Sequence, residues 1–334
     1  MSPDMNFFSC LILSSALPAQ WTVTAAHEIS RPDDPATLSG ITCVSGDTYL
    51  AATDWQPTLY ELKIPLDPET ARPLSLSATR RGELLACEDV EDVASDPLDR
   101  TRVFSIDEHS GTLNCHSITG GQPLATRKLT GALARTRLDM GLESLAISPD
   151  GLTLWTANEE ATEDDGPVST RKHGTDVRIA RFRRNGKGLT WRADGEWVYR
   201  TDPKAGGHWK SASGCDVDRS GVSALCVLHD GTLLALEREF SVVLVPRFRC
   251  RLYEVDLSAA TDVADCTSVS NRPIVRAGKR LLHEAVGLSM YEGVCEGPRG
   301  ADGSTSLVLV SDADHRFMVK SLMTLKLKRK TSAP

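Results

Sequence analysis

"GLESLAISPDGLTLWTANEE" occupies Gly141–Glu160 and consists of two short apolar stretches separated by a Pro-Asp-Gly turn. Apolar residues that alternate on both sides of such a turn are typical of a β-hairpin. The hairpin also carries acid at defined places, with Glu143 near the start of its first strand and Glu159 at the end of its second. This stretch therefore predicts a buried hairpin with carboxylates at the ends of its strands.

The same pattern occurs four more times in the chain. The related segments are "TLSGITCVSGDTYLAATDW" from Thr37, "DVEDVASDPLDRTRVFSIDE" from Asp89, "GVSALCVLHDGTLLALERE" from Gly221 and "MYEGVCEGP…SLVLVSDAD" from Met290. The apolar residue that closes each opening signature is Ile41, Val93, Leu145, Leu225 or Val294. Hairpins of one type that recur along a chain are typical of a β-propeller, in which each blade is a four-stranded sheet. We therefore predict an all-β protein with the fold of a five-bladed β-propeller, the alternative being six blades, one of which has lost the signature.

The segments between the hairpins supply the remaining strands. In the third repeat, "VRIARFRR" and "LTWRADGEWVYR" predict the third and fourth strands of the blade. Near the C-terminus, "FMVKSLMTLKLK" predicts a third strand for the last blade, and the N-terminal "QWTVTAAHEI" predicts its fourth. The two ends of the chain would then close the ring, and residues 20–330 would form a single domain.

The first residues have the character of a targeting segment. An apolar run from Phe7 to Leu17 is too short to span a membrane and is followed by small residues. This predicts a secretory signal peptide over residues 1–19 and a secreted or periplasmic protein. An apolar N-terminal strand is the alternative interpretation.

Composition excludes some classes of function. The 334 residues are 40% hydrophobic and 25% charged, with a formal net charge of −7. Nucleic-acid binding usually needs a basic surface, so we expect no such partner. We also expect no membrane span, a monomer, and a small anionic substrate, which would need metal ions or a local basic patch to offset repulsion.

The cysteines suggest no metal motif. Eight lie outside the predicted signal peptide and none has CxxC spacing. Cys250 and Cys266 would face each other if the stretch between them formed a hairpin, which predicts a disulfide. Free buried thiols are the alternative.

Acidic residues recur at two positions of the repeat. The start of the first strand reads Ser39, Glu91, Glu143, Ser223 and Glu292, and the end of the second reads Asp54, Asp107, Glu159, Glu237 and Asp312. Innermost strands of a propeller line its channel, so equivalent positions lie around one axis. Converging carboxylates would raise one another's pKa, and Ca²⁺ would relieve this repulsion. The predicted metal ligands are Glu91, Asp107, Glu143, Glu159, Glu292 and Asp312. Alternatively, each acid accepts hydrogen bonds from a turn or pairs with arginine.

Common catalytic motifs are absent from the sequence. "GVSAL" at Gly221 lacks the second glycine of a GxSxG elbow, and "HEAVG" at His283 fails the HExxH pattern. No P-loop or GxGxxG is present.

The chain resembles a known family, the phytase-like domain proteins often labelled "esterase-like activity of phytase". "GLESLAISPDGLTLWTANEE", "VSALCVLHDGTLLALERE" followed by "RLYEVDL", and "YEGV…LVLVSDAD" carry the resemblance, which extends over about Leu38–Leu327. It implies a propeller related to calcium-dependent phytases, in which channel carboxylates hold calcium ions that bind phosphate and activate water. It also implies that Glu143, Glu237 and Glu292 are catalytic and that Arg238 contacts an anion. Ser39 and Ser223 depart from the acidic pattern.

These observations favour a calcium-dependent hydrolase of phosphoric esters that acts on a phosphorylated small molecule. Two alternatives are a non-catalytic propeller that calcium stabilises and a lactonase-type hydrolase with one metal ion. The fold does not decide between them, because propellers carry many functions.

Overall fold

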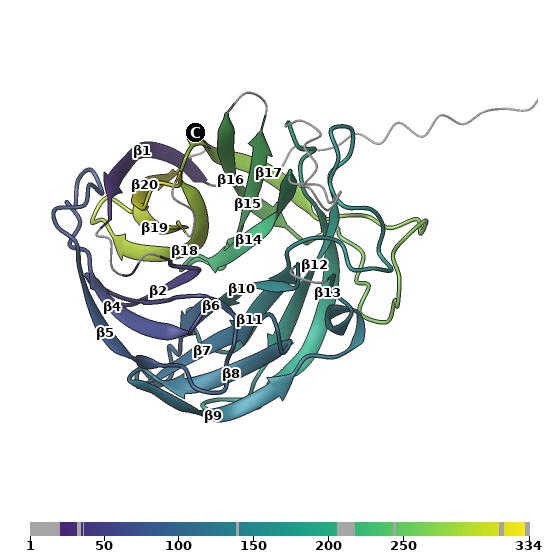
Figure 1. Cartoon of the computed structure of the whole chain (residues 1–334), viewed down its shortest axis with the longest axis horizontal. Coiled ribbons are helices and arrows are strands. Elements are labelled where there is room, and N and C mark those ends of the chain that lie inside the picture. The colour runs from purple at the N-terminus through teal and green to yellow at the C-terminus, as the bar shows by residue number, and fades with distance from the viewer. Residues whose placement is uncertain are drawn as a thin grey trace, which may run out of the picture.

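The computed structural model describes residues 21–31, 35, 37–137, 140–205, 218–242, 245–313 and 317–330. Within these ranges, twenty strands form five antiparallel sheets of four strands each. The sheets follow one another around a central axis in chain order (Figure 1). The predicted five-bladed β-propeller is confirmed, and the alternative of six blades is wrong. The predicted signal peptide, residues 1–19, lies outside the described residues.

The first four blades each use four consecutive strands, with the earliest strand innermost. Blade one contains β2 (Gly40–Ser45), β3 (Thr48–Ala52), β4 (Thr58–Lys63) and β5 (Ser77–Glu83). Blade two contains β6 (Val90–Ser95), β7 (Arg102–Asp107), β8 (Thr112–Ser117) and β9 (Gly120–Lys128). Blade three contains β10 (Leu142–Ile147), β11 (Thr153–Asn158), β12 (Asp176–Arg183) and β13 (Arg192–Arg200). Blade four contains β14 (Arg219–Val227), β15 (Leu233–Val242), β16 (Pro246–Asp256) and β17 (Gly278–Gly287).

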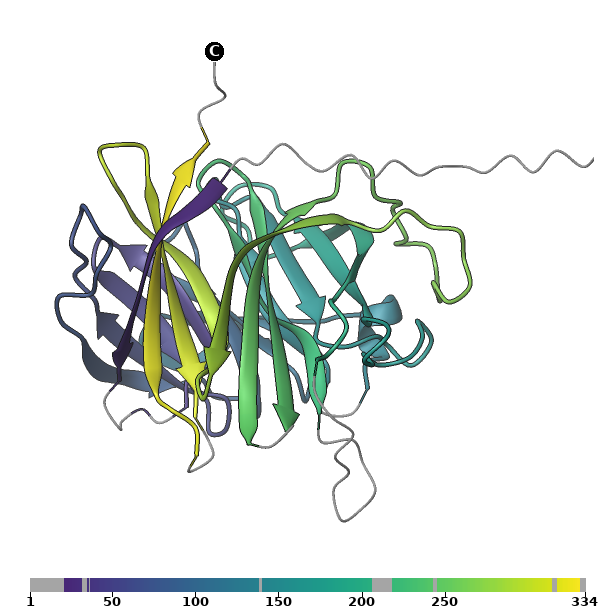
Figure 2. The same ribbon diagram turned by 90° about the horizontal axis from the view of Figure 1, so that it is seen from above.

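Blade five joins the two ends of the chain. It contains β18 (Met290–Arg299), β19 (Thr305–Asp312), β20 (Ser321–Arg329) and, as its outermost strand, β1 (Trp21–Ser30). The pairing of β1 with β20 runs from Trp21 opposite Arg329 to Ser30 opposite Ser321. Figure 2 shows β1, in purple, crossing the yellow strands of this blade. The predicted closure of the ring by both termini is therefore confirmed.

The hydrophobic core lies between the blades. Each pair of neighbouring blades shares a cluster of buried side chains, and blades four and five share a second, smaller one. Between blades two and three, for example, Phe104 meets Trp191 edge to face with ring centroids 5.6 Å apart. Such packing holds the inner strands in fixed positions, so side chains at the ends of these strands are placed rigidly. The short 3-10 helix η1 (Gly131–Ala134) is the one helix in the described ranges, and no helix there could span a membrane.

The predicted disulfide between Cys250 and Cys266 is wrong. Both cysteines are free, as are the other cysteines that the structure describes. Cys250 lies on β16 and its thiol contacts the backbone of Ser289 and Tyr291. Cys266 lies in the loop after β16, because β16 forms its hairpin with the more distant β17. The fully buried Cys250 has a raised pKa, because burial disfavours the thiolate.

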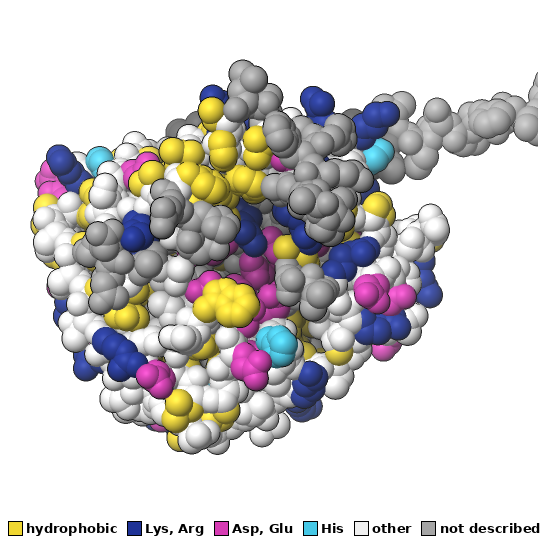
Figure 3. Space-filling model, in the orientation of Figure 1, with side chains coloured by type: hydrophobic (Ala, Val, Ile, Leu, Met, Phe, Trp, Pro, Cys, Tyr) yellow, Lys and Arg dark blue, Asp and Glu magenta, His cyan; other side chains and the backbone are white. Residues whose placement is uncertain are grey.

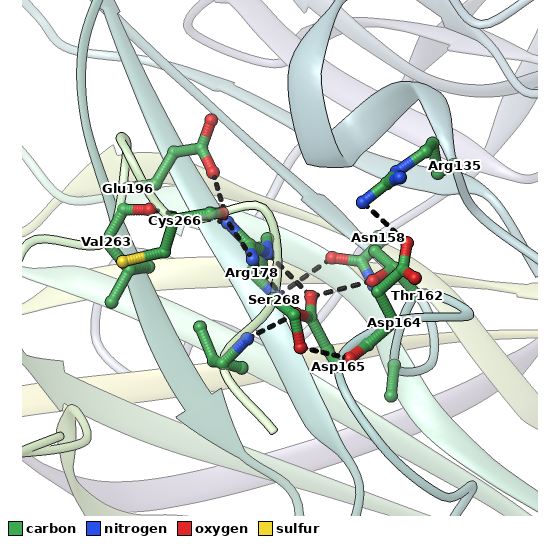
Figure 4. Close-up of polar contacts among 12 residues, drawn as sticks. Arg135, Asn158, Thr162, Asp164, Asp165, Arg178, Glu196, Val263, Cys266 and Ser268 are labelled. Atoms are coloured by element: carbon green, nitrogen blue, oxygen red, sulfur yellow. Dashed lines mark hydrogen bonds and ion pairs between the residues drawn. The ribbon is translucent and has the colours of Figure 1, made fainter. Parts of the chain in front are cut away.

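A buried ion pair anchors two long loops to blade three (Figure 4). Arg178 on β12 contacts Asp165 at 2.6 Å, and neither side chain is exposed. Arg178 also binds Glu196 at 3.0 Å and donates a hydrogen bond to the carbonyl of Cys266. Its backbone N–H donates to Asn158, the last residue of β11. These bonds fix the segment that follows the end of β11.

Replacing Asp165 with asparagine is expected to destabilise the protein by about 3–5 kcal/mol, because Arg178 would stay buried without its main counter-ion. Burial alone would raise the pKa of Asp165, but hydrogen bonds from Arg178 and Thr162 outweigh it and lower the pKa. The carboxylate therefore stabilises the fold above the ordinary pKa of aspartate, and this contribution is lost as the pH falls through the lowered value. Urea unfolding at several pH values measures the difference.

The neighbouring Asp164 provides a matched control. It pairs with Arg135 at 2.6 Å, but both side chains are well exposed. Asp164→Asn should therefore change the free energy of unfolding by no more than about 1 kcal/mol. Equal losses in the two variants would contradict a special role of the buried pair.

Candidate functional site

Four of the five innermost strands contain a β-bulge at the same repeat position. The pairing register skips one residue between Val90 and Asp92, Leu142 and Ser144, Val222 and Ala224, and Tyr291 and Gly293. The skipped residues are Glu91, Glu143, Ser223 and Glu292. A bulge inserts one extra residue and redirects its side chain. The repeated glutamates of the sequence signature are thus bulge residues, and the contacts below show that their carboxylates converge.

The register also identifies the residues that are equivalent at the end of the second strand. The residue before each bulge pairs with Asn158 in blade three, Asp107 in blade two, Glu237 in blade four and Ser311 in blade five. The residue after each of these lies nearer the channel mouth. The equivalent set is therefore Asp54, Glu108, Glu159, Arg238 and Asp312, which we call the mouth ring. In this register Asp107 and Glu237 lie one residue before the positions equivalent to Asp54, Glu159 and Asp312.

Arg238 is the cation of the mouth ring. Its guanidinium lies 2.7 Å from Glu159, 2.9 Å from Glu292 and 3.2 Å from Glu143. These acids come from blades three and five, so blade four supplies the charge that joins them. Burial alone would lower the pKa of Arg238, but the three carboxylates raise it overall, so the side chain stays charged. Burial and neighbouring acids raise the pKa of Glu143 and Glu292, against the opposing effect of Arg238.

A second acidic group lies beside the first, on blade two. Asp89, Glu91 and Glu108 each offer a carboxylate oxygen, and these oxygens lie within 4.8 Å of one another. Burial and the nearby Asp54 raise the pKa of Asp89, while burial and the carboxylates of Glu143 and Glu292 raise that of Glu91. We call Asp54, Asp89, Glu91 and Glu108 the acidic cluster.

Two carboxylate oxygens of the acidic cluster have no hydrogen-bond partner. Asp54 Oδ1 and Asp89 Oδ1 are buried without a hydrogen-bond partner. In the described part of the chain, no lysine or arginine forms an ion pair with Asp54, Asp89 or Glu91. A buried carboxylate oxygen without a partner is costly unless it binds a cation. Several carboxylates on a rigid frame are the ligands that hard divalent cations such as Ca²⁺ prefer, so the residues fit a metal site.

The other predicted residues lie in different surroundings. Asp107 accepts hydrogen bonds from the backbone N–H groups of Glu88, Asp89 and Ser110, which makes it a turn residue that shapes the acidic cluster from behind. Asp312 accepts a bond from the N–H of Ala313 at 2.6 Å and raises the pKa of Glu292.

Glu237 is held in a network of its own. It accepts hydrogen bonds from the Tyr199 hydroxyl at 2.6 Å and the Asp202 N–H at 3.0 Å, and it pairs with Lys279 at 2.6 Å. The structure therefore brings together Glu91, Glu143, Glu159, Glu292 and Arg238, and does not bring Asp107 or Glu237 to the same centre. The sequence prediction of the site did not include Asp89, which occupies a repeat position where the other blades have no acid.

Two glycines allow the blades to close around these acids. A Cβ at Gly221 would lie 2.5 Å from the Cγ of Glu159, and one at Gly141 would lie 2.7 Å from the Cγ of Glu108. The backbone that enters each of these blades thus packs directly on a mouth-ring acid of the blade before it. Figure 3 shows the result, with acidic side chains gathered in a hollow at the centre of this face.

Replacing Arg238 with methionine is expected to destabilise the protein by about 3–5 kcal/mol near neutral pH, because three buried carboxylates would lose their common cation. The pKa values of Glu143 and Glu292, already raised, would rise further. Since an acid with a raised pKa in the folded state destabilises that state as the pH increases, the loss should be larger at pH 8 than at pH 5. Urea unfolding in the presence of a chelator measures it.

Arg200→Met is the control for this experiment, because its partner Asp176 keeps a second ion pair with Arg276. Its effect should be small and nearly independent of pH. A pH-independent loss in Arg238→Met would contradict the role of the arginine in charge compensation.

Comparisons with known proteins identify the family of the chain. Residues 36–315 match the phytase-like family, described as "Esterase-like activity of phytase". No match was found among curated proteins. Among solved structures, the chain is similar to glutaminyl cyclase from Myxococcus xanthus, with 12% identity, a TM-score of 0.39, and coverage of 94% of this chain and 100% of that one. A putative oxidoreductase (glucose dehydrogenase) from Thermus thermophilus has 12% identity and a TM-score of 0.41, with coverage of 90% and 99%. Because the family match extends over most of its length, the chain belongs to the phytase-like family.

Proposed function

We propose that the channel mouth is the active site of a metal-dependent hydrolase of phosphoric esters, in which the acidic cluster holds the metal. The observation that carries this proposal is the placement of Asp89, Glu91 and Glu108, whose carboxylate oxygens lie within 4.8 Å of one another. Membership of a family described by phytase and esterase activity supports ester hydrolysis. We further propose that the protein acts outside the cytoplasm, as its predicted signal peptide implies.

Calcium is the cation that we propose first. The donors are all carboxylate oxygens, and Ca²⁺ accepts six to eight oxygen ligands in flexible geometry. Asp89, Glu91 and Glu108 would be its protein ligands, and the unpartnered Oδ1 of Asp54 lies on the same side. When bound, such an ion offsets the charge of a phosphate and lowers the pKa of a water molecule.

Glu143 is the best candidate for a general base. Its bulge position places it between the two acidic groups, since it pairs with Arg238 at 3.2 Å and influences the pKa of Glu91. A buried carboxylate with a raised pKa can accept a proton from water near neutral pH. Glu292 pairs with the other terminal nitrogen of the Arg238 guanidinium and would help to hold it.

Arg238 is better described as a positioning residue than as the anion contact that the resemblance implied. Its guanidinium already pairs with three carboxylates, and its side chain is 20% exposed. Little of its charge is left for a substrate. We propose that it fixes the carboxylates of Glu143 and Glu159 and opposes the rise in the pKa of Glu143 that burial causes.

Activity provides the first test. Phosphate release from 4-nitrophenyl phosphate and from phytate should require Ca²⁺ and stop with a chelator. Glu91→Gln should reduce the rate at fixed Ca²⁺ by roughly 100-fold, because a direct ligand contributes at least as much as the outer contacts whose loss costs about 10- to 100-fold. Glu88→Gln is the control, since Glu88 is a well-exposed acid on the same segment that pairs with His109.

Thermal unfolding tests metal binding separately. Ca²⁺ at about 100 times its Kd should stabilise the wild-type protein by about 2.7 kcal/mol, and this gain should disappear in Asp89→Asn but not in Glu88→Gln. Stabilisation by Ca²⁺ without turnover of any phosphoric ester would contradict the hydrolase and favour the calcium-stabilised binding propeller. Turnover of lactones alone would favour the lactonase-type alternative.

A further inference from the structure

An exposed tryptophan stands at the edge of the acidic cluster. Trp55 follows Asp54 directly, and its backbone pairs with that of Asp89 in an isolated β-bridge. The residue is 72% exposed, the largest fraction among the exposed large hydrophobic side chains of the described chain. Figure 3 shows hydrophobic side chains bordering the acidic hollow. A tryptophan left in water beside a candidate active site lacks the burial that usually stabilises this side chain.

The loop that carries Trp55 is firmly built. The backbone N–H of Thr53 donates to the carbonyl of Thr58 at 3.1 Å, and the N–H of Thr58 donates to the Thr53 hydroxyl at 3.0 Å. Gln56 has a φ of 55°, which is uncommon for a residue with a side chain. Strain of this kind persists where surrounding contacts impose it and is concentrated at functional sites. The loop therefore presents the indole ring at a defined place instead of letting it fold onto the core.

A cavity of about 530 Å³ begins next to this loop and is lined by blade one and by the segment that leads from β5 to β6. Gln56 and Cys87 line one part of it, and each is two residues from an acid of the cluster. Farther along, Tyr60, Leu84 and Leu85 provide apolar walls. The charged lining residues are Arg80 and Glu83, which pair with each other at 2.7 Å. The cavity thus has no net charge, in contrast to the acidic mouth beside it.

We propose that Trp55 and this cavity bind the organic group of the substrate, and that this group is an uncharged ring with an apolar face, joined to a single phosphate. This inference rests on the proposed function. The phosphate would lie at the acidic cluster, where one bound cation offsets its charge, and the ring would stack on the indole. The shared chemistry is a ring with an apolar face, which an aromatic ring and a sugar ring both provide.

The charge of the surroundings argues against a ring with many phosphates. Arg238 pairs with three carboxylates, and Arg80 pairs with Glu83. Further phosphates on the ring would lie in a cavity without net charge, whose one basic lining residue, Arg80, already pairs with Glu83, next to an acidic mouth that repels them. A fully phosphorylated ring also leaves no apolar face for the indole. The preferred substrate is therefore a monoester.

Binding of non-hydrolysable phosphonates tests the inference on the full-length protein with Ca²⁺. Calorimetry would compare phenylphosphonate and the phosphonate analogue of glucose 6-phosphate with methylphosphonate, which has no ring. We expect at least one ring-bearing probe to bind about tenfold to 100-fold more tightly than methylphosphonate. The two ring probes distinguish an aromatic from a sugar substrate.

Variants show whether Trp55 is responsible. Trp55→Ala should abolish the preference for the ring, and Trp55→Phe should keep most of it. Leu124→Ala is the matched control, because Leu124 is 56% exposed on β9, the outermost strand of blade two. Since Trp55 and Leu124 are both exposed, neither alanine variant should unfold the protein, and thermal melting verifies this.

The outcomes separate this inference from the proposed function. Equal binding of ring-bearing and ringless phosphonates, or a preference that survives in Trp55→Ala, would overturn the tryptophan platform even if Ca²⁺-dependent phosphate release is found. A parallel comparison of benzoate with acetate tests the case in which Trp55 binds a ring but the protein does not bind phosphoric esters. A Trp55-dependent preference for benzoate without any phosphonate binding would uphold the platform and overturn phosphoric ester chemistry. Failure of every probe to bind would overturn the platform as well.

Discussion

Three carboxylates meet one guanidinium at the centre of the ring, and the arrangement of the channel mouth depends on this contact. Inner strands of a propeller bring equivalent positions together, so a repeat with acid in every copy would crowd negative charge around one axis. Blade four places Arg238 at the position where blades one, two, three and five have Asp54, Glu108, Glu159 and Asp312. This single exchange of an acid for a cation allows Glu143, Glu159 and Glu292 to be buried in a fold that otherwise repeats itself.

The exchange also makes the mouth asymmetric. Arg238 reaches the acids of blades three and five, whereas Asp89 and Glu91 on blade two form no ion pair with a lysine or arginine in the described ranges. The proposed metal site therefore lies on one side of the mouth only. Trp55 and its cavity lie on that same side, at blade one and the segment that leads from β5 to β6. The candidate chemistry is thus displaced from the axis of the ring, although the fold has nearly fivefold symmetry.

The repeats were enough to predict the ring, the closure by both chain ends, and the acids Glu91, Glu143, Glu159 and Glu292. Which of two adjacent polar residues faces the mouth was beyond the pattern, because Asp107 precedes Glu108 and Glu237 precedes Arg238. That choice depends on strand register, which the bulges at Glu91 and Ser223 shift by one residue. The disulfide prediction failed for a similar reason, since the partner of β16 lies beyond Cys266. Contacts between blades, such as that of Trp55 with Asp89, leave no periodic signal in the sequence.

The two serines that break the acidic pattern now have a physical explanation. The Ser39 hydroxyl donates to the carbonyl of Val90 at 2.6 Å, and that of Ser223 donates to the carbonyl of Tyr291 at 3.4 Å. Each serine thus binds the backbone of the next blade instead of adding a carboxylate to the mouth. Glutamates at both positions would increase a negative charge that Arg238 alone already fails to neutralise. The raised pKa values of Asp89 and Glu91 favour the protonated forms of these carboxylates more than at exposed acids. Protons would therefore compete with a divalent cation for the same oxygens, so that binding of the proposed metal becomes stronger as the pH rises.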